Sequence, residues 1–137
     1  MDKKSVSGSC LCGKVTFKIE TPLLMFRYCH CSRCRKATGS AHASNIFILP
    51  EHFSWISGDE NVVRYDLHEA SGFATCFCKT CGSPLPHTTK RNEVVVPAGT
   101  LDDDPGQLPE SNIFWKFRAS WSLEPGEMPK FDEYENK

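Results

Sequence analysis

The sequence predicts a mainly antiparallel β domain with little helix, and three observations lead to this prediction. Val15, Phe17 and Ile19 alternate with polar residues, which is the period of a half-buried strand. Several short runs rich in β-branched and aromatic residues follow it, and turns containing glycine, proline or acidic residues separate many of them. Only one short stretch has the character of a helix, so strands account for most of the expected structure.

The first predicted strand covers residues 14–19, and later strand runs cover residues 46–48, 53–56, 62–65 and 94–96. The predicted helix covers residues 32–38 and ends before Gly39, a suitable C-terminal cap. A loop rich in proline and acidic residues follows Gly99 and continues to residues 112–117, and residues 130–137 are expected to fray. A length of 137 residues fits a single domain, 1–137, with an ordered core from about 6 to about 130.

The charge balance excludes some classes of partner. With 16 basic and 17 acidic residues the net charge is -1, so bulk attraction to nucleic acid or to an anionic membrane is not expected. No apolar run is long enough for a transmembrane helix, and the N-terminus lacks the apolar segment of a secretory signal. We therefore expect a cytoplasmic protein; its oligomeric state does not follow from the sequence.

Cysteine is the unusual residue of this chain. An even count could mean four disulfides, but that interpretation needs an oxidising compartment, and reduced thiols at short spacings favour metal binding. Zinc suits such ligands, since it prefers four tetrahedral positions and binds thiolate well. The eight cysteines are Cys10, Cys12, Cys29, Cys31, Cys34, Cys76, Cys78 and Cys81.

Two cysteine pairs predict a structural zinc site. Cys78 and Cys81 are separated by two residues and followed by Gly82, which is the form of a zinc knuckle. Cys10 and Cys12, followed by their own glycine, supply the other two sulfurs. Four protein ligands make a closed site, so its expected role is to stabilise the fold by joining the first strand to a late hairpin.

The middle group predicts a different kind of site. Cys29, Cys31 and Cys34 provide three thiolates, and three protein ligands with one open position are typical of catalytic zinc. The open position could take water or the thiolate of a small substrate. Nearby basic residues could balance the negative charge or bind substrate carboxylates, or could simply be a solvated helix face; they are Arg27, Arg33, Arg35 and Lys36.

The sequence leaves three interpretations of Cys76. It could be an ordinary buried thiol, a fourth ligand that closes the middle site, or a redox partner. His30 lies between two proposed ligands and would point away from the metal on an extended backbone. Trp121 is expected to be a core or rim aromatic residue that could line a pocket, and the acidic run 102–104 is expected to be solvated.

The ordered motifs of the chain resemble those of the glutathione-dependent formaldehyde-activating enzyme family, which includes centromere-protein-V-like proteins. The matching stretches are residues 8–15, 28–36 with 39–40, 77–85 and 98–103, with a weaker match at Ser120-Trp121, Pro129 and Phe131. Seven cysteines match in spacing, whereas Cys76 departs from the family pattern.

This resemblance implies a fold of coiled antiparallel sheets, called a β-tent, with two Zn²⁺ ions. It implies that Cys10, Cys12, Cys78 and Cys81 bind a structural zinc, and that Cys29, Cys31 and Cys34 bind a catalytic one. It also implies addition of glutathione to formaldehyde, which gives S-hydroxymethylglutathione and is classed in reverse as a carbon–sulfur lyase reaction.

The predicted function is therefore that of a zinc-dependent lyase whose partners are a small thiol such as glutathione and a small aldehyde. Arg33 and Arg35 are the first candidates for binding the glutathione carboxylates. One alternative is a non-catalytic zinc module that binds a protein partner, with two closed four-cysteine sites. Another is a thiol sensor in which Cys76 forms a disulfide with a released zinc ligand.

Overall fold

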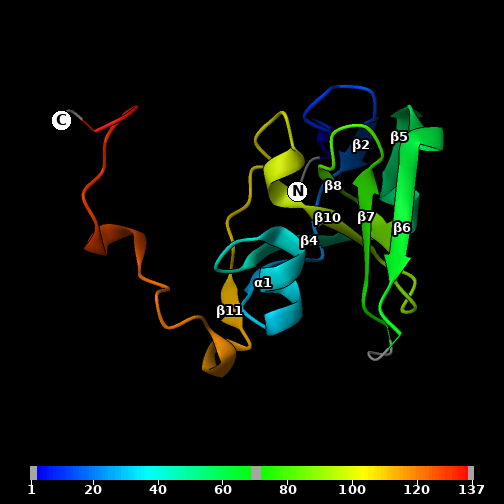
Figure 1. Ribbon diagram of the computed structural model, residues 1–137. Helices are drawn as coiled ribbons and strands as arrows, with labels where there is room; N and C mark the ends of the chain where they lie inside the picture. Colours follow the sequence, from blue (N-terminus) through cyan, green and yellow to red (C-terminus); the bar gives the residue numbers. More distant parts are fainter. Residues whose placement is uncertain (1–2, 69–71, 136–137) are drawn as a thin grey trace.

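The computed structural model describes residues 3–68 and 72–135, and these residues form a mainly β structure with one α-helix. Its strands are short and are arranged in three sheets (Figure 1). All neighbouring strands run antiparallel except one parallel pair at the edge of the largest sheet. The predicted mainly antiparallel β fold with little helix is confirmed.

Each sheet combines strands that are distant in the sequence. The first sheet has the order β1-β2-β5, from Ser5–Ser9, Thr16–Glu20 and Phe53–Ser57. The second has the order β11-β3-β4-β10-β9, from Ser111–Ile113, Met25–Cys29, Ala43–Ile48, Val94–Pro97 and His87–Thr88. The third has the order β6-β7-β8, from Val62–Asp66, Ala74–Cys78 and Pro84–Leu85.

The predicted elements all occur, with small changes at their ends. Four of the five strand runs lie within β4, β5, β6 and β10, and the first overlaps β2, which begins two residues later than predicted. Helix α1 (Ser32–Thr38) ends at Gly39, whose φ of 65° and N–H···O bond of 2.8 Å to the Arg35 carbonyl close the helix. Five 3₁₀ turns join other elements: Pro50–His52, Asp59–Asn61, Ala98–Thr100, Trp115–Phe117 and Pro125–Glu127.

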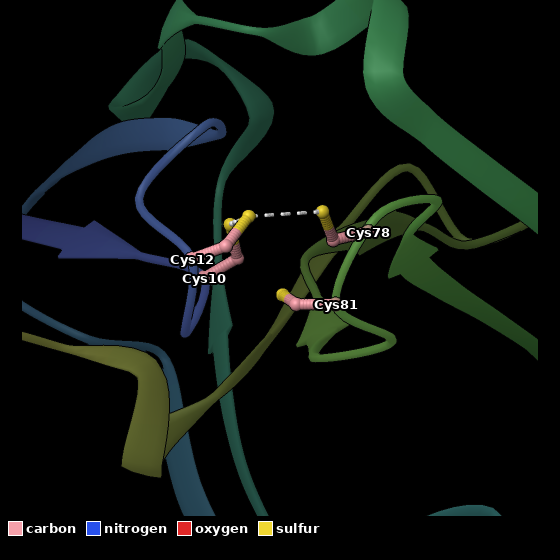
Figure 2. A group of neighbouring side chains, drawn as sticks. All are labelled: Cys10, Cys12, Cys78 and Cys81. Carbon is pink, nitrogen blue, oxygen red and sulfur yellow. Dashed lines mark hydrogen bonds between the residues drawn. The ribbon is translucent and has the colours of Figure 1, made fainter.

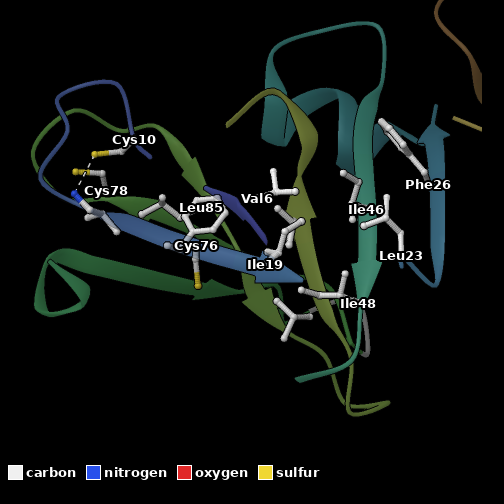
Figure 3. Close-up of a cluster of buried hydrophobic side chains, with 14 residues drawn as sticks. Val6, Cys10, Ile19, Leu23, Phe26, Ile46, Ile48, Cys76, Cys78 and Leu85 are labelled. Atoms are coloured by element: carbon white, nitrogen blue, oxygen red, sulfur yellow. Dashed lines mark hydrogen bonds between the residues drawn. The ribbon is translucent and has the colours of Figure 1, made fainter. Parts of the chain in front are cut away.

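The larger of two hydrophobic clusters lies between the sheets (Figure 3). The inward side chains of β2, Phe17 and Ile19, are at most 1% exposed, and Ile46 and Ile48 of β4 are fully buried. Alternating residues of a strand face opposite sides, so each of these pairs presents one apolar face to the core. This core holds the β1–β2 and β7–β8 hairpins in the positions from which they supply cysteines.

The acidic run 102–104, predicted to be solvated, is exposed and also binds strand β1. The Ser9 hydroxyl donates to Asp102 at 2.9 Å, and the Ser7 backbone N–H donates to the Asp103 carboxylate at 3.0 Å. The long loop after β10 is thereby fixed to the edge of the first sheet. Among the described residues, no helix has both the length and the apolar character needed to cross a lipid bilayer. Of the predicted frayed terminus, residues 136–137 lie outside the described residues.

Candidate metal centres

All eight cysteines are free thiols, and seven of them gather in two clusters. The first cluster contains Cys10, Cys12, Cys78 and Cys81, whose sulfurs all lie within 4.8 Å of one another. Figure 2 shows the first two on the loop after β1, facing the other two on the β7–β8 hairpin. The structure thus brings together the four sulfurs that the sequence assigned to one site.

Two turns with left-handed glycines shape the first cluster. Gly13 has a φ of 81° and Gly82 a φ of 76°, a region that side chains with a Cβ adopt only at a cost. Each glycine N–H donates to the carbonyl of the first cysteine in its turn, at 3.1 Å to Cys10 and 2.8 Å to Cys78. The glycines therefore allow both cysteines of each pair to point to the same side.

Polar groups of neighbouring residues contact three of the four sulfurs. The side chain and backbone of Ser83 lower the pKa of Cys81 to about 5. The backbone N–H of Val15 lies 3.4 Å from the Cys10 sulfur, and the Asn61 amide lies 3.2 Å from the Cys78 sulfur. The contact of Asn61 could not be predicted from the sequence, because an asparagine beside a predicted strand carries no signal for such a contact.

The spacing of these sulfurs suits a tetrahedral zinc ion. Zinc–sulfur bonds of about 2.3 Å in tetrahedral geometry place neighbouring sulfurs about 3.8 Å apart. The Cys12 and Cys78 sulfurs are 3.8 Å apart, and those of Cys10 and Cys12 are 3.6 Å apart. The donor set and its dimensions therefore fit a structural zinc.

The second cluster contains Cys29, Cys31 and Cys34, whose sulfurs also lie within 4.8 Å of one another. Cys29 ends strand β3, and Cys34 lies in the first turn of helix α1. Cys31 is the N-cap of this helix, and its sulfur accepts the backbone N–H of Cys34 at 3.4 Å. A strand end and a helix start thus place the three sulfurs together, and this donor set fits a metal bound by three thiolates.

Charge is shared unevenly within the second cluster. The neighbouring Cys34 thiol stabilises the Cys29 thiolate and lowers the pKa of Cys29 to about 6. The proximity of Cys29 and burial raise the pKa of Cys34. Repulsion among three adjacent thiolates raises their free energy unless a cation compensates the negative charge. This is a further reason why the group suits a divalent metal.

Cys76 lies outside both clusters. It is 7% exposed, belongs to the hydrophobic core and pairs with Leu85 of β8 (Figure 3). Burial raises the pKa of this thiol, so the neutral form is favoured. Of the three interpretations left open by the sequence, the structure supports the buried thiol.

A cavity of about 390 Å³ adjoins the second cluster, with Cys29 and Cys34 among its lining residues. It lies between β7 and the large sheet, and apolar side chains form much of its wall. These include Phe47, Phe73, Phe77, Leu85 and Val95. Such a cavity can hold a small organic molecule against the cysteine group.

Among the described residues that line the cavity, Arg27 is the one arginine. Residues 27 and 29 of strand β3 face the same side, so Arg27 and Cys29 share the cavity. The Arg27 guanidinium lies 5.0 Å above the Phe47 ring, and its buried Nε has no hydrogen-bond partner. Arg33 and Arg35, the sequence candidates for carboxylate binding, lie on α1 and are not among the residues that line the cavity.

His30 is positioned away from the cysteine cluster, in agreement with the alternation predicted for it. It is 2% exposed, and its Nε2 lies 2.8 Å from the Asn112 side-chain oxygen. Its ring makes a T-shaped contact with the Trp115 ring, with centroids 4.9 Å apart. The contact of His30 with Asn112 therefore helps to hold β11 beside β3. Trp121, which the sequence suggested could line a pocket, is 64% exposed and is not among the residues that line the cavity.

The lowered pKa of His87 predicts that the stability of the fold depends on pH. Burial, with a contribution from Arg64 and an opposing one from Asp66, lowers its pKa from 6.5 to about 4. The unfolded chain binds the proton more readily than the folded chain does. The contribution of His87 to the free energy of unfolding is therefore fully present above the unfolded pKa of 6.5, and it is lost as pH falls from 6.5 toward 4. We expect a loss of about 1 kcal/mol between about pH 8 and about pH 5.5 from this group.

Urea unfolding of the native chain and of His87→Gln at both pH values measures this contribution. Protonation of the cysteine clusters affects both proteins alike, so the difference between their pH slopes reports His87. Equal slopes in the two proteins would contradict the prediction.

Comparison with known proteins identifies relatives of this chain. The sequence model of the glutathione-dependent formaldehyde-activating enzyme family matches residues 5–117. A crystal structure of a Rhodobacter sphaeroides protein, a structural genomics target, is similar with a TM-score of 0.56 and 29% identity; the match covers 75% of this chain and 97% of that one. A search of curated proteins found no match.

Proposed function

Since this chain belongs to the glutathione-dependent formaldehyde-activating enzyme family, we propose that it is a zinc-dependent enzyme that joins a small thiol such as glutathione to formaldehyde or a similar aldehyde. The observation that carries the proposal is the cavity of about 390 Å³ beside a three-cysteine cluster. A volume in this range suits a small ligand, and the cluster offers fewer than the four protein ligands of a structural site.

The two cysteine clusters have different proposed roles. Cys10, Cys12, Cys78 and Cys81 would hold a structural zinc that stabilises a single domain, and Cys29, Cys31 and Cys34 would hold a catalytic one. Zinc bound by the three cysteines would lower the pKa of a thiol or polarise a carbonyl. The eight free thiols are consistent with a reducing compartment, and we propose the cytoplasm.

The reaction we propose needs no oxidant or reductant. The thiol sulfur forms a bond to the aldehyde carbon, and the thiol proton ends on the aldehyde oxygen, giving an S-hydroxymethyl product. In reverse the same step breaks a carbon–sulfur bond, which is lyase chemistry. The apolar walls of the cavity exclude water and strengthen the electrostatic interactions of groups held inside it.

The alternative of a non-catalytic module with two closed four-cysteine sites receives less support. It needs a fourth sulfur at the second cluster, and Cys76 was the candidate. Cys76 instead belongs to the hydrophobic core and is not a member of that cluster.

Exchange spectroscopy of formaldehyde and glutathione tests the proposed reaction. We expect the exchange rate to rise in proportion to the concentration of zinc-loaded protein and to return to the uncatalysed rate after chelation. An exchange rate that the loaded protein leaves unchanged would refute the enzyme. With cobalt in place of zinc, glutathione should also alter the thiolate charge-transfer spectrum, whereas a closed module would show no change.

Arg27 is the residue we propose for binding a carboxylate of the thiol substrate. The buried Nε atoms of Arg27 and Arg35 both have no hydrogen-bond partner, but of these two residues only Arg27 lines the cavity, from the Cys29 face of β3. Arg27→Met keeps an apolar side chain above Phe47 but removes the charge. Loss of one charge-assisted hydrogen bond should raise KM for glutathione roughly tenfold to a hundredfold, with a smaller change in kcat.

Matched controls separate this role from a general loss of charge. Arg33→Met and Arg35→Met remove charges that do not line the cavity, so KM for glutathione should stay within about twofold of the native value. Cysteamine, a thiol without a carboxylate, should react equally well with native protein and Arg27→Met. If the helix variants raised KM for glutathione and Arg27→Met did not, the assignment would move to α1.

A further inference from the structure

The C-terminal arm, residues 114–135, exposes more apolar surface than any other part of the described chain. Eight large apolar side chains of this segment are 40% to 95% exposed. They are Phe114, Trp115, Phe117, Trp121, Leu123, Met128, Phe131 and Tyr134. Figure 1 shows the arm, in orange to red, leading away from the sheets after β11.

Little holds the arm to its own chain. Among the described residues, the hydrogen bonds made by the arm stay within it, at the turns 114–118, 119–122 and 124–127. The contact between the Trp115 and His30 rings is the aromatic pair that joins the arm to the body. The arm's large apolar surface is therefore not covered by its own domain.

The start of the arm nevertheless has a defined conformation. Phe114 has a φ of 55°, an uncommon value for a residue other than glycine, and it is followed by the 3₁₀ turn Trp115–Phe117. The Arg118 guanidinium lies 4.5 Å above the Trp115 ring and donates to the Trp115 carbonyl at 3.0 Å. These contacts direct the chain outward, and the composition is too apolar for a solvated tail.

The exposed surface of the arm is large enough for a stable interface. An aromatic side chain can bury roughly 150–250 Å², so eight side chains that are about half exposed offer roughly 800 Å² per copy. That is about the area that each partner contributes to a specific complex of ordinary size. Most of the arm also lies beyond residue 117, where the match to the family model ends.

Charge indicates which surface the arm would meet. Its distal part carries one basic residue, Lys130, and five acidic residues: Glu124, Glu127, Asp132, Glu133 and Glu135. Helix α1 presents the opposite charge through Arg33, Arg35 and Lys36, with no acidic residue in its sequence. Ile113, the last residue of β11, packs against the buried cluster that contains Cys34 of this helix, so the arm begins near α1.

We propose that two copies of this chain form a reciprocal dimer in which the arm of each copy lies across helix α1 of the other. An exchange of identical arms about a two-fold axis covers both apolar segments at once and sets each acidic arm end against a basic helix. The arm leads away from its own body, so the helix it meets belongs to the second copy.

Sedimentation of the full chain tests the dimer. We expect a species of twice 15.4 kDa at micromolar concentration. The double substitution Trp121→Ser, Phe131→Ser should raise the dissociation constant about a hundredfold, since each lost apolar contact is worth about tenfold. Ile56→Ser, which removes a side chain of similar exposure (58%) on β5, should leave the dissociation constant unchanged.

Two sedimentation results would overturn the proposal. One is a native chain that is monomeric throughout the micromolar range, which would leave the arm free for another protein. The other is a dimer that the arm substitutions do not weaken. Far-ultraviolet circular dichroism of each variant verifies that its fold is intact.

Cross-linking distinguishes a second copy from the arm's own body. Copies labelled with ¹⁴N and ¹⁵N are mixed, and a carbodiimide joins carboxylates to nearby lysines without a spacer. We expect cross-links between Lys36 and the acidic arm residues in peptides that combine the two isotopes. Cross-links found only within one isotope would mean that the arm folds back on its own helix, and the reciprocal dimer would be wrong.

Discussion

Cys78→Ser is expected to release the metal from the four-cysteine cluster and to leave the chain largely unfolded at physiological temperature. Cys78 is fully buried at the end of β7, and its sulfur lies 3.8 Å from that of Cys12. The cluster joins the β1–β2 hairpin to the β7–β8 hairpin, which belong to different sheets. A structural zinc site contributes about 10–16 kcal/mol, which is comparable to the whole stability of an ordinary domain. Metal analysis and thermal unfolding measure the two effects.

Cys76→Ala is the matched control for this substitution. Cys76 lies on the same strand and face, two residues earlier, and is 7% exposed. Removing its sulfur from the core should cost about 1–2 kcal/mol and leave both metals bound. If Cys78→Ser retained two metal equivalents and unfolded like Cys76→Ala, the four cysteines would not be a structural zinc site.

Cys31→Ser is expected to abolish catalysis while preserving the fold. Cys31 is the N-cap of α1, and serine is among the best residues for accepting the same N–H bond from Cys34. The substitution therefore spares the helix and removes a thiolate from the three-cysteine cluster. We expect one metal equivalent to be lost, the melting temperature to change by only a few degrees, and the rate of the thiol–aldehyde exchange to fall to the uncatalysed rate.

Two measurements test whether a loss of activity in Cys31→Ser comes from the three-cysteine cluster and not from unfolding. The remaining metal equivalent should stay bound in Cys31→Ser, because the four-cysteine cluster is intact. Thermal unfolding should resemble that of the native chain. A Cys31→Ser protein with one metal equivalent and native activity would place the chemistry elsewhere and contradict the proposed role of this cluster.

Strands with their own apolar alternation could be predicted, and those that depend on partners could not. Phe17 and Ile19 make the first predicted strand visible in the sequence. Strand β1 contains serines, one glycine and Val6, and its extended form depends on pairing with β2 and on bonds from the acidic run 102–104. Strand β11 has three residues and pairs in parallel with β3, more than eighty positions earlier, a contact that no local pattern encodes.

The cysteine spacing predicted the membership of both clusters, because ligands within a few residues must share one turn. It did not predict which basic residue faces the cavity. Arg33 and Arg35 are near Cys34 in sequence but lie on the helix, whereas Arg27 is brought to the cavity by strand β3, which is absent from the predicted strands. Had that strand been recognised, its two-residue period would have placed Arg27 beside Cys29.

The separation of the cysteines along the chain has a consequence for biosynthesis. The second cluster is complete once residue 34 has left the ribosome, whereas the first cluster joins residue 10 to residue 81. At about 5–20 residues per second, the pair Cys78 and Cys81 emerges several seconds after the local group. A nascent chain that has emerged to residue 34 could thus hold a metal at the three-cysteine cluster, whereas the four-cysteine cluster requires the chain to have emerged to residue 81. The two clusters therefore become complete at different stages of synthesis, the four-cysteine cluster second.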